Sequence, residues 1–206
     1  MTELKIRKTT ILLMTAIVLI GIMGFKYKTS EKTDYLITIT TDFGVMKALL
    51  YDDTPIHKKN FITLAGDGKY DGSIFHRVIN NFMIQGGGLP SPYHEYYDTL
   101  PMDKKTLPNE IMEKHKHKFG AIAAARTNNP EKRSDISQFY IVQNHAGAHH
   151  LDNGYTVFGQ VIVGFDVIDK IAQQPVNGSV PVKPIKMIIK VDKVKRSDIE
   201  KFYGKW

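Results

Sequence analysis

Apolar and polar residues alternate along much of the chain with the period of two that is typical of β-strands. Residues 35–40 show this alternation first, and Asp42, Phe43 and Gly44 can form a turn into a second strand at 45–51. Six further runs of short, apolar or alternating sequence predict strands at 74–79, 82–85, 119–125, 138–143, 156–163 and 185–194. The pattern therefore predicts eight short strands.

Two segments have the spacing of apolar residues that is typical of a helix. The first follows Thr54 and Pro55, which are favoured as a helix cap and a first helical residue, and Gly66 suits its end. The second is predicted at 165–173, where large apolar side chains recur every three residues. These are the only helices that we expect in the folded part of the chain.

Together these elements predict a mainly β fold. Eight strands without long parallel crossovers fit a closed eight-stranded antiparallel β-barrel, because closure leaves no exposed edge and two α-helices can cap the open ends. Residues 34–196 would form this domain. Within it, 89–107 is rich in proline and tyrosine and is predicted to be a long polar insertion or loop, and 197–206 is predicted to be a C-terminal tail.

The amino terminus has a different pattern. A basic flank at 1–8 precedes an uncharged, largely aliphatic run at 9–25, which reaches the lower limit of about 17 residues for a membrane-spanning helix. A cleaved signal peptide is the alternative, although its apolar region is typically shorter and ends in small residues. We favour an uncleaved transmembrane anchor, followed by a linker at 26–33. The basic flank favours a cytoplasmic amino terminus, so either alternative places the folded domain outside the cytoplasm, on the periplasmic side.

Composition and charge restrict the functions to consider. The chain has no cysteine, which excludes disulfides, thiol nucleophiles and cysteine-based zinc sites. Its net charge is +7, but the lysines are scattered without interleaved aromatic residues, so we expect no nucleic-acid partner. Five histidines lack an ordered set of carboxylates nearby in the sequence, so we expect solvated loop side chains, no metal and no cofactor. They are His115, His117, His145, His149 and His150.

The most unusual stretch of the chain is 75–87, which places Arg77 in an apolar, strand-like run that ends on two glycines. An arginine taken out of water without a partner costs several kcal/mol. Most arginines avoid this cost in surface ion pairs, but the apolar neighbours argue against that interpretation here. The stretch instead indicates an apolar pocket that holds one cationic hydrogen-bond donor.

Five sequence blocks occur in an order that makes the chain resemble the cyclophilin family of peptidyl-prolyl cis-trans isomerases, particularly bacterial members, over roughly residues 35–195. The blocks begin at Phe75, Pro108, Gly120, Ser137 and Leu151. The resemblance implies an eight-stranded barrel capped by two helices, in agreement with the pattern. It also implies the rotation of X-Pro peptide bonds, whose barrier is about 18–20 kcal/mol. An enzyme lowers this barrier by binding the twisted bond better than the planar bond.

Arg77 is the candidate catalytic residue, because twisting localises a lone pair on the prolyl nitrogen and a guanidinium can donate to it. The resemblance implies that eleven other residues bind the substrate. Those expected to form an apolar socket for the proline ring are Phe82, Met83, Tyr140 and Leu151. Those expected along the peptide groove are Gln85, Ala125, Arg126, Thr127, Gln138, His150 and Tyr155. Gln85 would hold the substrate backbone, and His150 replaces the tryptophan of drug-binding members, so weaker cyclosporin binding is expected.

The sequence therefore predicts a membrane-tethered, monomeric peptidyl-prolyl cis-trans isomerase that acts without a cofactor on proline-containing polypeptides as they fold. The alternative is a non-catalytic chaperone or scaffold module that binds proline peptides on the same barrel. The two functions differ in whether Arg77 changes the rate of bond rotation.

Overall fold

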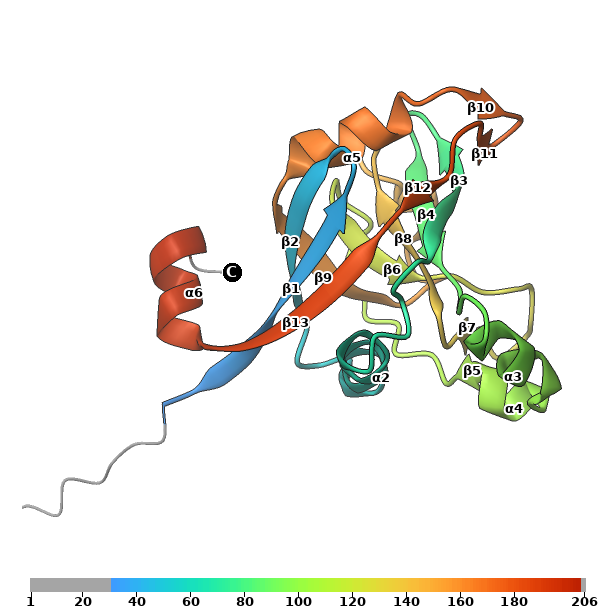
Figure 1. Ribbon diagram of the computed structural model, residues 1–206. Coiled ribbons are helices and arrows are strands. Elements are labelled where there is room, and N and C mark those ends of the chain that lie inside the picture. Colours follow the sequence, from blue (N-terminus) through green and yellow to red (C-terminus); the bar gives the residue numbers. More distant parts are fainter. Residues whose placement is uncertain (1–30, 205–206) are drawn as a thin grey trace, which may run out of the picture. The chain divides into compact units, whose positions relative to one another are not determined.

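The computed structural model describes residues 31–204 of the chain (Figure 1). The anchor predicted at 9–25, its basic flank and residues 26–30 of the linker lie outside the described residues. Between residues 31 and 204, no helix has both the length and the apolar character needed to cross a membrane.

The fold is mainly β, as predicted. Nine strands form one curled antiparallel sheet in the order β12-β3-β4-β8-β6-β9-β2-β1-β13 (Figure 1). Its strands are β1 (Thr33–Thr41), β2 (Gly44–Leu50), β3 (Ile74–Ile79), β4 (Met83–Gly87), β6 (Ala121–Ala124), β8 (Gln138–Val142), β9 (Val157–Val163), β12 (Ile185–Lys186) and β13 (Ile188–Lys195). Two small ribbons pair β5 (Thr106–Leu107) with β7 (Ser134–Asp135) and β10 (Val176–Asn177) with β11 (Val180–Pro181).

The sheet has nine strands rather than the predicted eight because the segment at 185–194 is divided at Met187. β12 pairs with β3 at one end of the sheet, and β13 pairs with β1 at the other end. One continuous segment of chain therefore borders both ends of the curled sheet. At the division, the Met187 side chain is fully buried and its backbone N–H donates to the Ser73 carbonyl at 2.9 Å.

Both predicted helices are present, as α2 (Pro55–Gly66) and α5 (Phe165–Ala172), and they lie at opposite ends of the curled sheet (Figure 1). Thr54 is the N-cap residue of α2 and Pro55 begins the helix, as predicted, but the Thr54 side chain makes no capping bond. Instead, the Glu110 carboxylate accepts from the backbone N–H groups of Ile56 and His57, each at 2.9 Å. A carboxylate at this end satisfies N–H groups that have no partner within the helix and complements the helix dipole.

Two regions that we predicted to lack regular structure contain helices. The insertion at 89–107 forms α3 (Tyr93–Thr99), α4 (Met102–Lys105) and the strand β5. The tail forms α6 (Arg196–Tyr203), whose buried Ile199 packs against Leu36 and Leu49 on the outside of the sheet. A short three-residue helix, η1 (His149–Leu151), also lies in the loop before β9. The pattern of proline and tyrosine did not reveal α3, which packs through distant contacts such as Tyr97 Oη to Asp135 Oδ2 at 2.8 Å.

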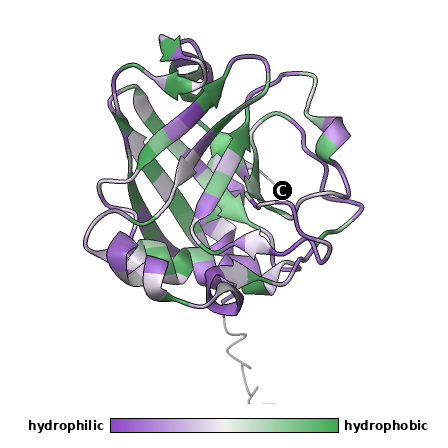
Figure 2. Cartoon of the chain, turned by 90° about the vertical axis from the view of Figure 1, so that its right-hand side faces the viewer, coloured by the Kyte–Doolittle hydropathy of each residue, from purple (hydrophilic) through white to green (hydrophobic). Residues whose placement is uncertain are grey.

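Alternation along β4, β6 and β8 divides their side chains between two apolar clusters. The main core contains one set of alternate residues: Ile84, Ile122, Ala124, Phe139 and Ile141. A second cluster contains the intervening residues: Met83, Ala121, Ala123, Tyr140 and Val142. Figure 2 shows how hydrophobic residues are concentrated along the strands. Both faces of these strands are therefore covered, and the second cluster forms the base of the site described below.

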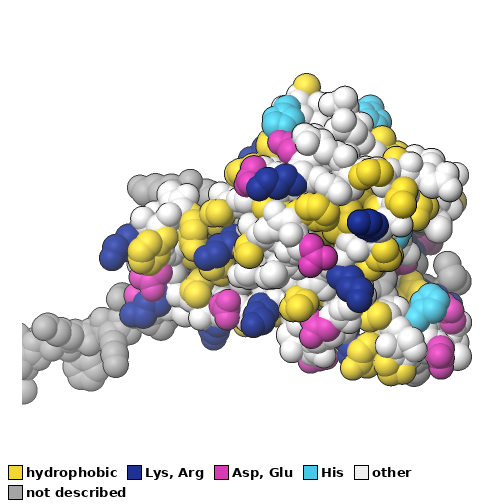
Figure 3. Space-filling view, turned by 45° about the horizontal axis from the view of Figure 1, so that its top comes forward, with side chains coloured by type: hydrophobic (Ala, Val, Ile, Leu, Met, Phe, Trp, Pro, Cys, Tyr) yellow, Lys and Arg dark blue, Asp and Glu magenta, His cyan; other side chains and the backbone are white. Residues whose placement is uncertain are grey.

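Charges of both signs are distributed over the surface. In Figure 3, lysine and arginine side chains are interspersed with aspartate and glutamate over the displayed face of the folded part. The positive net charge is thus not gathered into one continuous basic patch on that face.

Candidate active site

An irregularity in β3 turns Arg77 out of the main core. Phe75 and Val78 both belong to that core, although residues three apart in a regular strand point to opposite faces. The pairing register shifts between Phe75 and Arg77, so His76 is the extra residue of a β-bulge. As a result, Arg77 lies opposite Gln85 on β4 and faces away from the core.

The pairing register continues this row across the sheet. Gln85 lies opposite Tyr140 on β8, and Tyr140 lies opposite Ala123 on β6. Arg77 Nη1 donates to Gln85 Oε1 at 3.3 Å, and Gln85 Nε2 donates to Gln138 Oε1 at 3.3 Å. Arg77 Nη1 also lies 3.9 Å from the sulfur of Met83. Three neighbouring strands therefore contribute polar side chains to one row on an otherwise apolar surface, and Ala123 continues the row on β6.

A cavity of about 170 Å³ lies over this row. Every residue that lines it belongs to the set predicted from the sequence: Arg77, Phe82, Met83, Gln85, Ala125, Arg126, Tyr140, Leu151 and Tyr155. No carboxylate lines the cavity. The structure thus brings a cationic donor, an amide and an apolar socket together from segments that are distant in the sequence.

The three other predicted residues lie outside the cavity lining. Thr127 lines a neighbouring hollow together with residues of the loop at 129–133. Gln138 supports Gln85 through their hydrogen bond. His150 is exposed, and its ring centroid lies 5.3 Å from that of Phe82 at the rim.

The glycines that end β4 allow the close packing of the strands beneath the cavity. Gly87 has a φ of +81°, a conformation that side chains disfavour. A Cβ at this residue would lie 2.2 Å from the carbonyl oxygen of Ser137. This contact explains why the apolar run ends on glycine.

Arg126 is the second residue after the end of β6 and is held in place by several contacts. Its Nε donates to the Gly154 carbonyl at 3.0 Å, and its Nη1 donates to the Thr127 carbonyl at 3.2 Å. The guanidinium carbon lies 4.6 Å from the centroid of the Tyr155 ring, which is within the range of a cation–π interaction. The cavity therefore contains a second fixed cation besides Arg77.

The prediction of solvated histidines is wrong for His115 and His117. The His115 side chain is only 12% exposed and pairs with Asp53 at 2.7 Å. His117 is fully buried, with Nδ1 2.8 Å from Asp152 Oδ1 and Nε2 2.9 Å from the Tyr140 hydroxyl. His117 thus connects a carboxylate to the phenol that forms part of the cavity wall.

The hydrogen bonds assign the roles of the two His117 nitrogens. An ionised carboxylate only accepts, so Nδ1–H donates to Asp152, and the neutral ring accepts the Tyr140 O–H at Nε2. Burial lowers the pKa of His117, which favours this neutral form, and burial raises the pKa of Tyr140 well above its ordinary value. Burial alone would also raise the pKa of Asp152, but hydrogen bonds from the His117 backbone and ring bring that pKa to about 2.

No local sequence signal reveals this chain of hydrogen bonds. Asp152 and Tyr140 are 35 and 23 residues from His117 in the sequence. His117 lies among lysines just before a buried strand, and this pattern is equally typical of an exposed loop. The three residues are brought together by the pairing of β6 with β8 and by the backbone contact of the loop before β9, where the Ala148 N–H donates to the His117 carbonyl at 2.7 Å.

The geometry agrees with comparisons to known proteins. The family model described as "Cyclophilin type peptidyl-prolyl cis-trans isomerase/CLD" matches residues 36–192. The chain belongs to this family, whose members are enzymes that rotate X-Pro peptide bonds.

Individual relatives extend the comparison. A peptidyl-prolyl cis-trans isomerase of Acinetobacter baylyi is 40% identical over 162 residues, which cover 74% of this chain and 82% of the relative. Peptidyl-prolyl cis-trans isomerase A of Dickeya dadantii is 35% identical and covers 84% of this chain and 93% of its own length. The crystal structure of a cyclophilin-type isomerase of Cryptosporidium parvum, solved in the presence of the dipeptide Ala-Pro, is 26% identical with a TM-score of 0.65. The similarity covers 76% of this chain and 98% of that one.

Proposed function

We propose that this protein accelerates X-Pro bond rotation in folding polypeptides outside the cytoplasm, with Arg77 as the catalytic residue. The observation that carries the proposal is the position of Arg77 beside the apolar socket of a cavity whose lining contains no carboxylate. A guanidinium that is not neutralised by a carboxylate is available to a substrate.

The apolar and cationic parts of the cavity would have separate roles. Phe82, Met83 and Leu151 line the cavity and provide a surface for the proline ring. As the peptide bond twists, amide resonance is lost and the nitrogen lone pair becomes an acceptor. A donor from Arg77 then binds the twisted form better than the planar form, and this preference lowers the barrier. No covalent bond forms and no proton leaves the protein.

Gln85 would position Arg77 for this role. Its Oε1 accepts from Arg77 Nη1, and its Nε2 is held by Gln138. The amide is therefore oriented by a bond on each side. A planar guanidinium held at one terminal nitrogen can present its remaining N–H groups to a bound peptide in a fixed direction.

The decisive experiment measures kcat/KM on an Ala-Pro peptide for residues 31–206 and for Arg77→Ala. We expect a loss of about 100-fold or more, as is typical when one donor to a transition state is removed. Arg196→Ala is the matched control, because it removes an arginine from α6, outside the cavity. Equal rates for wild type and Arg77→Ala would refute the catalytic role. Peptide binding without turnover would then favour the non-catalytic binding module.

The proposed location depends on the amino-terminal sequence. Residues 9–25 carry no charge and follow Lys5, Arg7 and Lys8, which supports an anchor with the domain on the periplasmic side. We expect the membrane fraction to contain the uncleaved, monomeric chain, with the domain accessible to protease from outside. A mature chain that begins near residue 25 in mass spectrometry would contradict the anchor. Protection from external protease would contradict the location.

A further inference from the structure

Two arginines and no carboxylate line the cavity, and this balance of charge should affect which peptide substrates bind there. Arg77 and Arg126 both line it, and neither forms an ion pair with another residue between 31 and 204. Asp152, which neighbours Leu151 of the lining, is occupied elsewhere: its oxygens bond to His117 and His149. The positive charge of both guanidinium groups is therefore uncompensated within the cavity.

The sheet separates the two arginines. Arg77 lies on β3, and Arg126 follows the end of β6, with β4 and β8 between these strands. Three inter-strand spacings place the two backbones roughly 14 Å apart. The two arginines thus enter the cavity lining from strands that are not adjacent, and a peptide bound across these strands would approach Arg126 a short distance from the residue that meets Arg77.

The guanidinium of Arg126 is held in a fixed orientation that suits the binding of an anion. Its Nε and Nη1 are used by the Gly154 and Thr127 carbonyls, and Tyr155 lies against the guanidinium. No described contact uses Nη2, so one donor of the fixed group remains for a ligand. Because the side chain is already ordered, binding an anion costs little further conformational entropy. A second cation lies nearby, since Lys132 Nζ donates to the carbonyl of Asn153, the residue before Gly154.

We propose that the cavity selects acidic peptide substrates, with Arg126 binding the carboxylate of an Asp or Glu within two residues of the proline. The inference rests on the proposed isomerase function and specifies its substrate class. Two residues of extended chain span about 7 Å, which is half the separation of the two arginine backbones. A proline that meets Arg77 thus places a neighbouring acidic side chain within reach of Arg126. Arg77 stays free for the prolyl nitrogen.

The test compares peptides that differ only in charge. Four sets of pentapeptides with a central proline carry Glu, Gln or Lys at the first or second residue before the proline, or at the first or second residue after it. They are assayed by NMR exchange, which avoids the sequence preference of a coupling protease. In at least one set, kcat/KM for Glu should exceed that for Gln by about threefold to tenfold, with Lys lowest. The ratio should decrease at high salt, because exposed ion pairs are screened.

Variants assign the preference to one residue. Arg126→Met should bring the Glu to Gln ratio close to one, and Arg126→Lys should retain part of it. Lys190→Met removes the same charge from an exposed residue of β13 and should keep the wild-type ratio. Equal rates for Glu and Gln in all four sets, or an unchanged ratio in Arg126→Met, would overturn the inference. Turnover of the Gln peptides without a Glu preference refutes only the inference, whereas loss of turnover on every peptide refutes the proposed function.

Discussion

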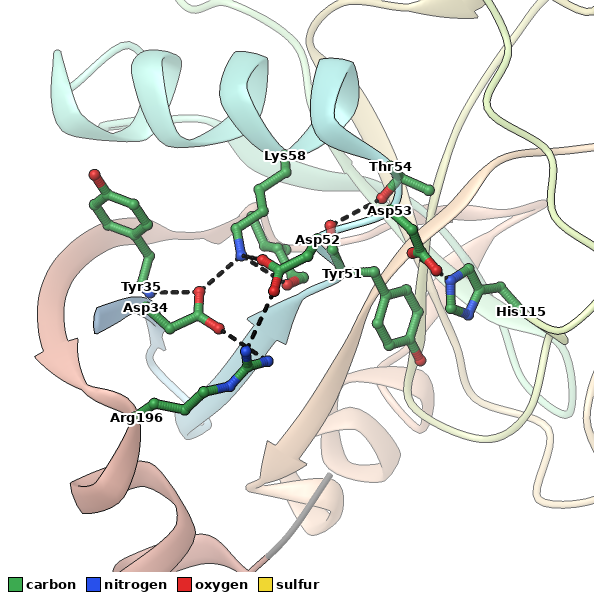
Figure 4. Close-up of polar contacts among 10 residues, drawn as sticks. Asp34, Tyr35, Tyr51, Asp52, Asp53, Thr54, Lys58, His115 and Arg196 are labelled. Carbon is green, nitrogen blue, oxygen red and sulfur yellow. Dashed lines mark hydrogen bonds and ion pairs between the residues drawn. The ribbon is translucent and has the colours of Figure 1, made fainter. Parts of the chain in front are cut away.

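The arginines of the cavity contrast with a second group of cations, near the carboxyl end of β2. Lys58 on α2 and Arg196 on α6 lie among the carboxylates of Asp34 and Asp52 (Figure 4). We call these four residues the Asp34 cluster. Lys58 Nζ lies 2.7 Å from Asp34 and 2.6 Å from Asp52, and it also donates to the Leu50 carbonyl at 3.1 Å.

The difference lies in the partners and not in the residue types. In the Asp34 cluster, each cation has two carboxylate partners, and the cluster connects β1, α2, α6 and the segment after β2. In the cavity, the corresponding partners are an amide, a sulfur and backbone carbonyls. A compensated charge holds segments of the chain together, whereas an uncompensated charge remains available to a ligand. The first should therefore affect stability and the second activity.

The two largest expected effects are opposite in kind: one substitution lowers stability and leaves activity unchanged, and the other lowers activity and leaves stability unchanged. Lys58→Met leaves the nearly buried Asp34, whose side chain is 3% exposed, without its closest cation. We expect the free energy of unfolding to fall by about 3 kcal/mol, with kcat/KM unchanged. Arg77→Met should lower kcat/KM about 100-fold and change the free energy of unfolding by less than about 0.5 kcal/mol. Urea denaturation and the peptide assay measure both quantities, and a large stability loss in Arg77→Met would break the comparison.

The hydrogen bonds from Asp152 through His117 to Tyr140 are intermediate between the two groups of cations, because they stabilise the fold and also support the cavity wall. Tyr140→Phe removes the hydroxyl that bonds to His117 Nε2 and leaves this nitrogen buried without a partner, which should cost about 1–3 kcal/mol of unfolding free energy. His117→Leu in the Tyr140→Phe background should cost less than His117→Leu alone. Denaturation of the two single variants and the double variant gives the coupling free energy. Additive losses would show that the bond contributes nothing.

A smaller effect is expected from pH. Burial lowers the pKa of His57 and His117 in the folded protein below the ordinary value of 6.5. The unfolded chain therefore binds more protons below that pH, so stability decreases as pH falls from 7.5 through 6.5 towards 5.5. Thermal unfolding at these pH values should show a falling midpoint for wild type and a weaker dependence for His117→Leu. A midpoint that rises towards pH 5.5 would contradict the lowered pKa values.

The smallest expected effect tests the edge of the Asp34 cluster. Arg196 is 34% exposed, and its nitrogens lie 3.4 Å from Asp52 and 3.7 Å from Asp34. Both distances are long and the guanidinium is partly exposed to solvent, which screens the charges, so Arg196→Met should lower the free energy of unfolding by less than about 1 kcal/mol. Urea denaturation at low and high salt is the measurement. A loss as large as that of Lys58→Met would mean that the two cations support the cluster equally.

Periodicity in the sequence determined much of the fold. The strands β1, β2 and β9 and the helices α2 and α5 lie within a few residues of their predicted positions, because alternation reports directly which face of a segment is buried. The residues that line the cavity were also named from the sequence, through the ordered blocks of a known family. Their proposed roles in binding and catalysis await the experiments above.

What the sequence alone left undecided depends on contacts between distant segments. The bulge at His76, the Glu110 cap of α2 and the burial of α6 each require a partner elsewhere in the chain. The same holds for His117, which resembles a loop histidine until Asp152 and Tyr140 are brought to its two nitrogens. Local pattern encodes whether a side chain is apolar enough to be buried. Only the tertiary structure decides which polar groups are paired, and this is why it alone separates the compensated Lys58 from the available Arg77 and Arg126.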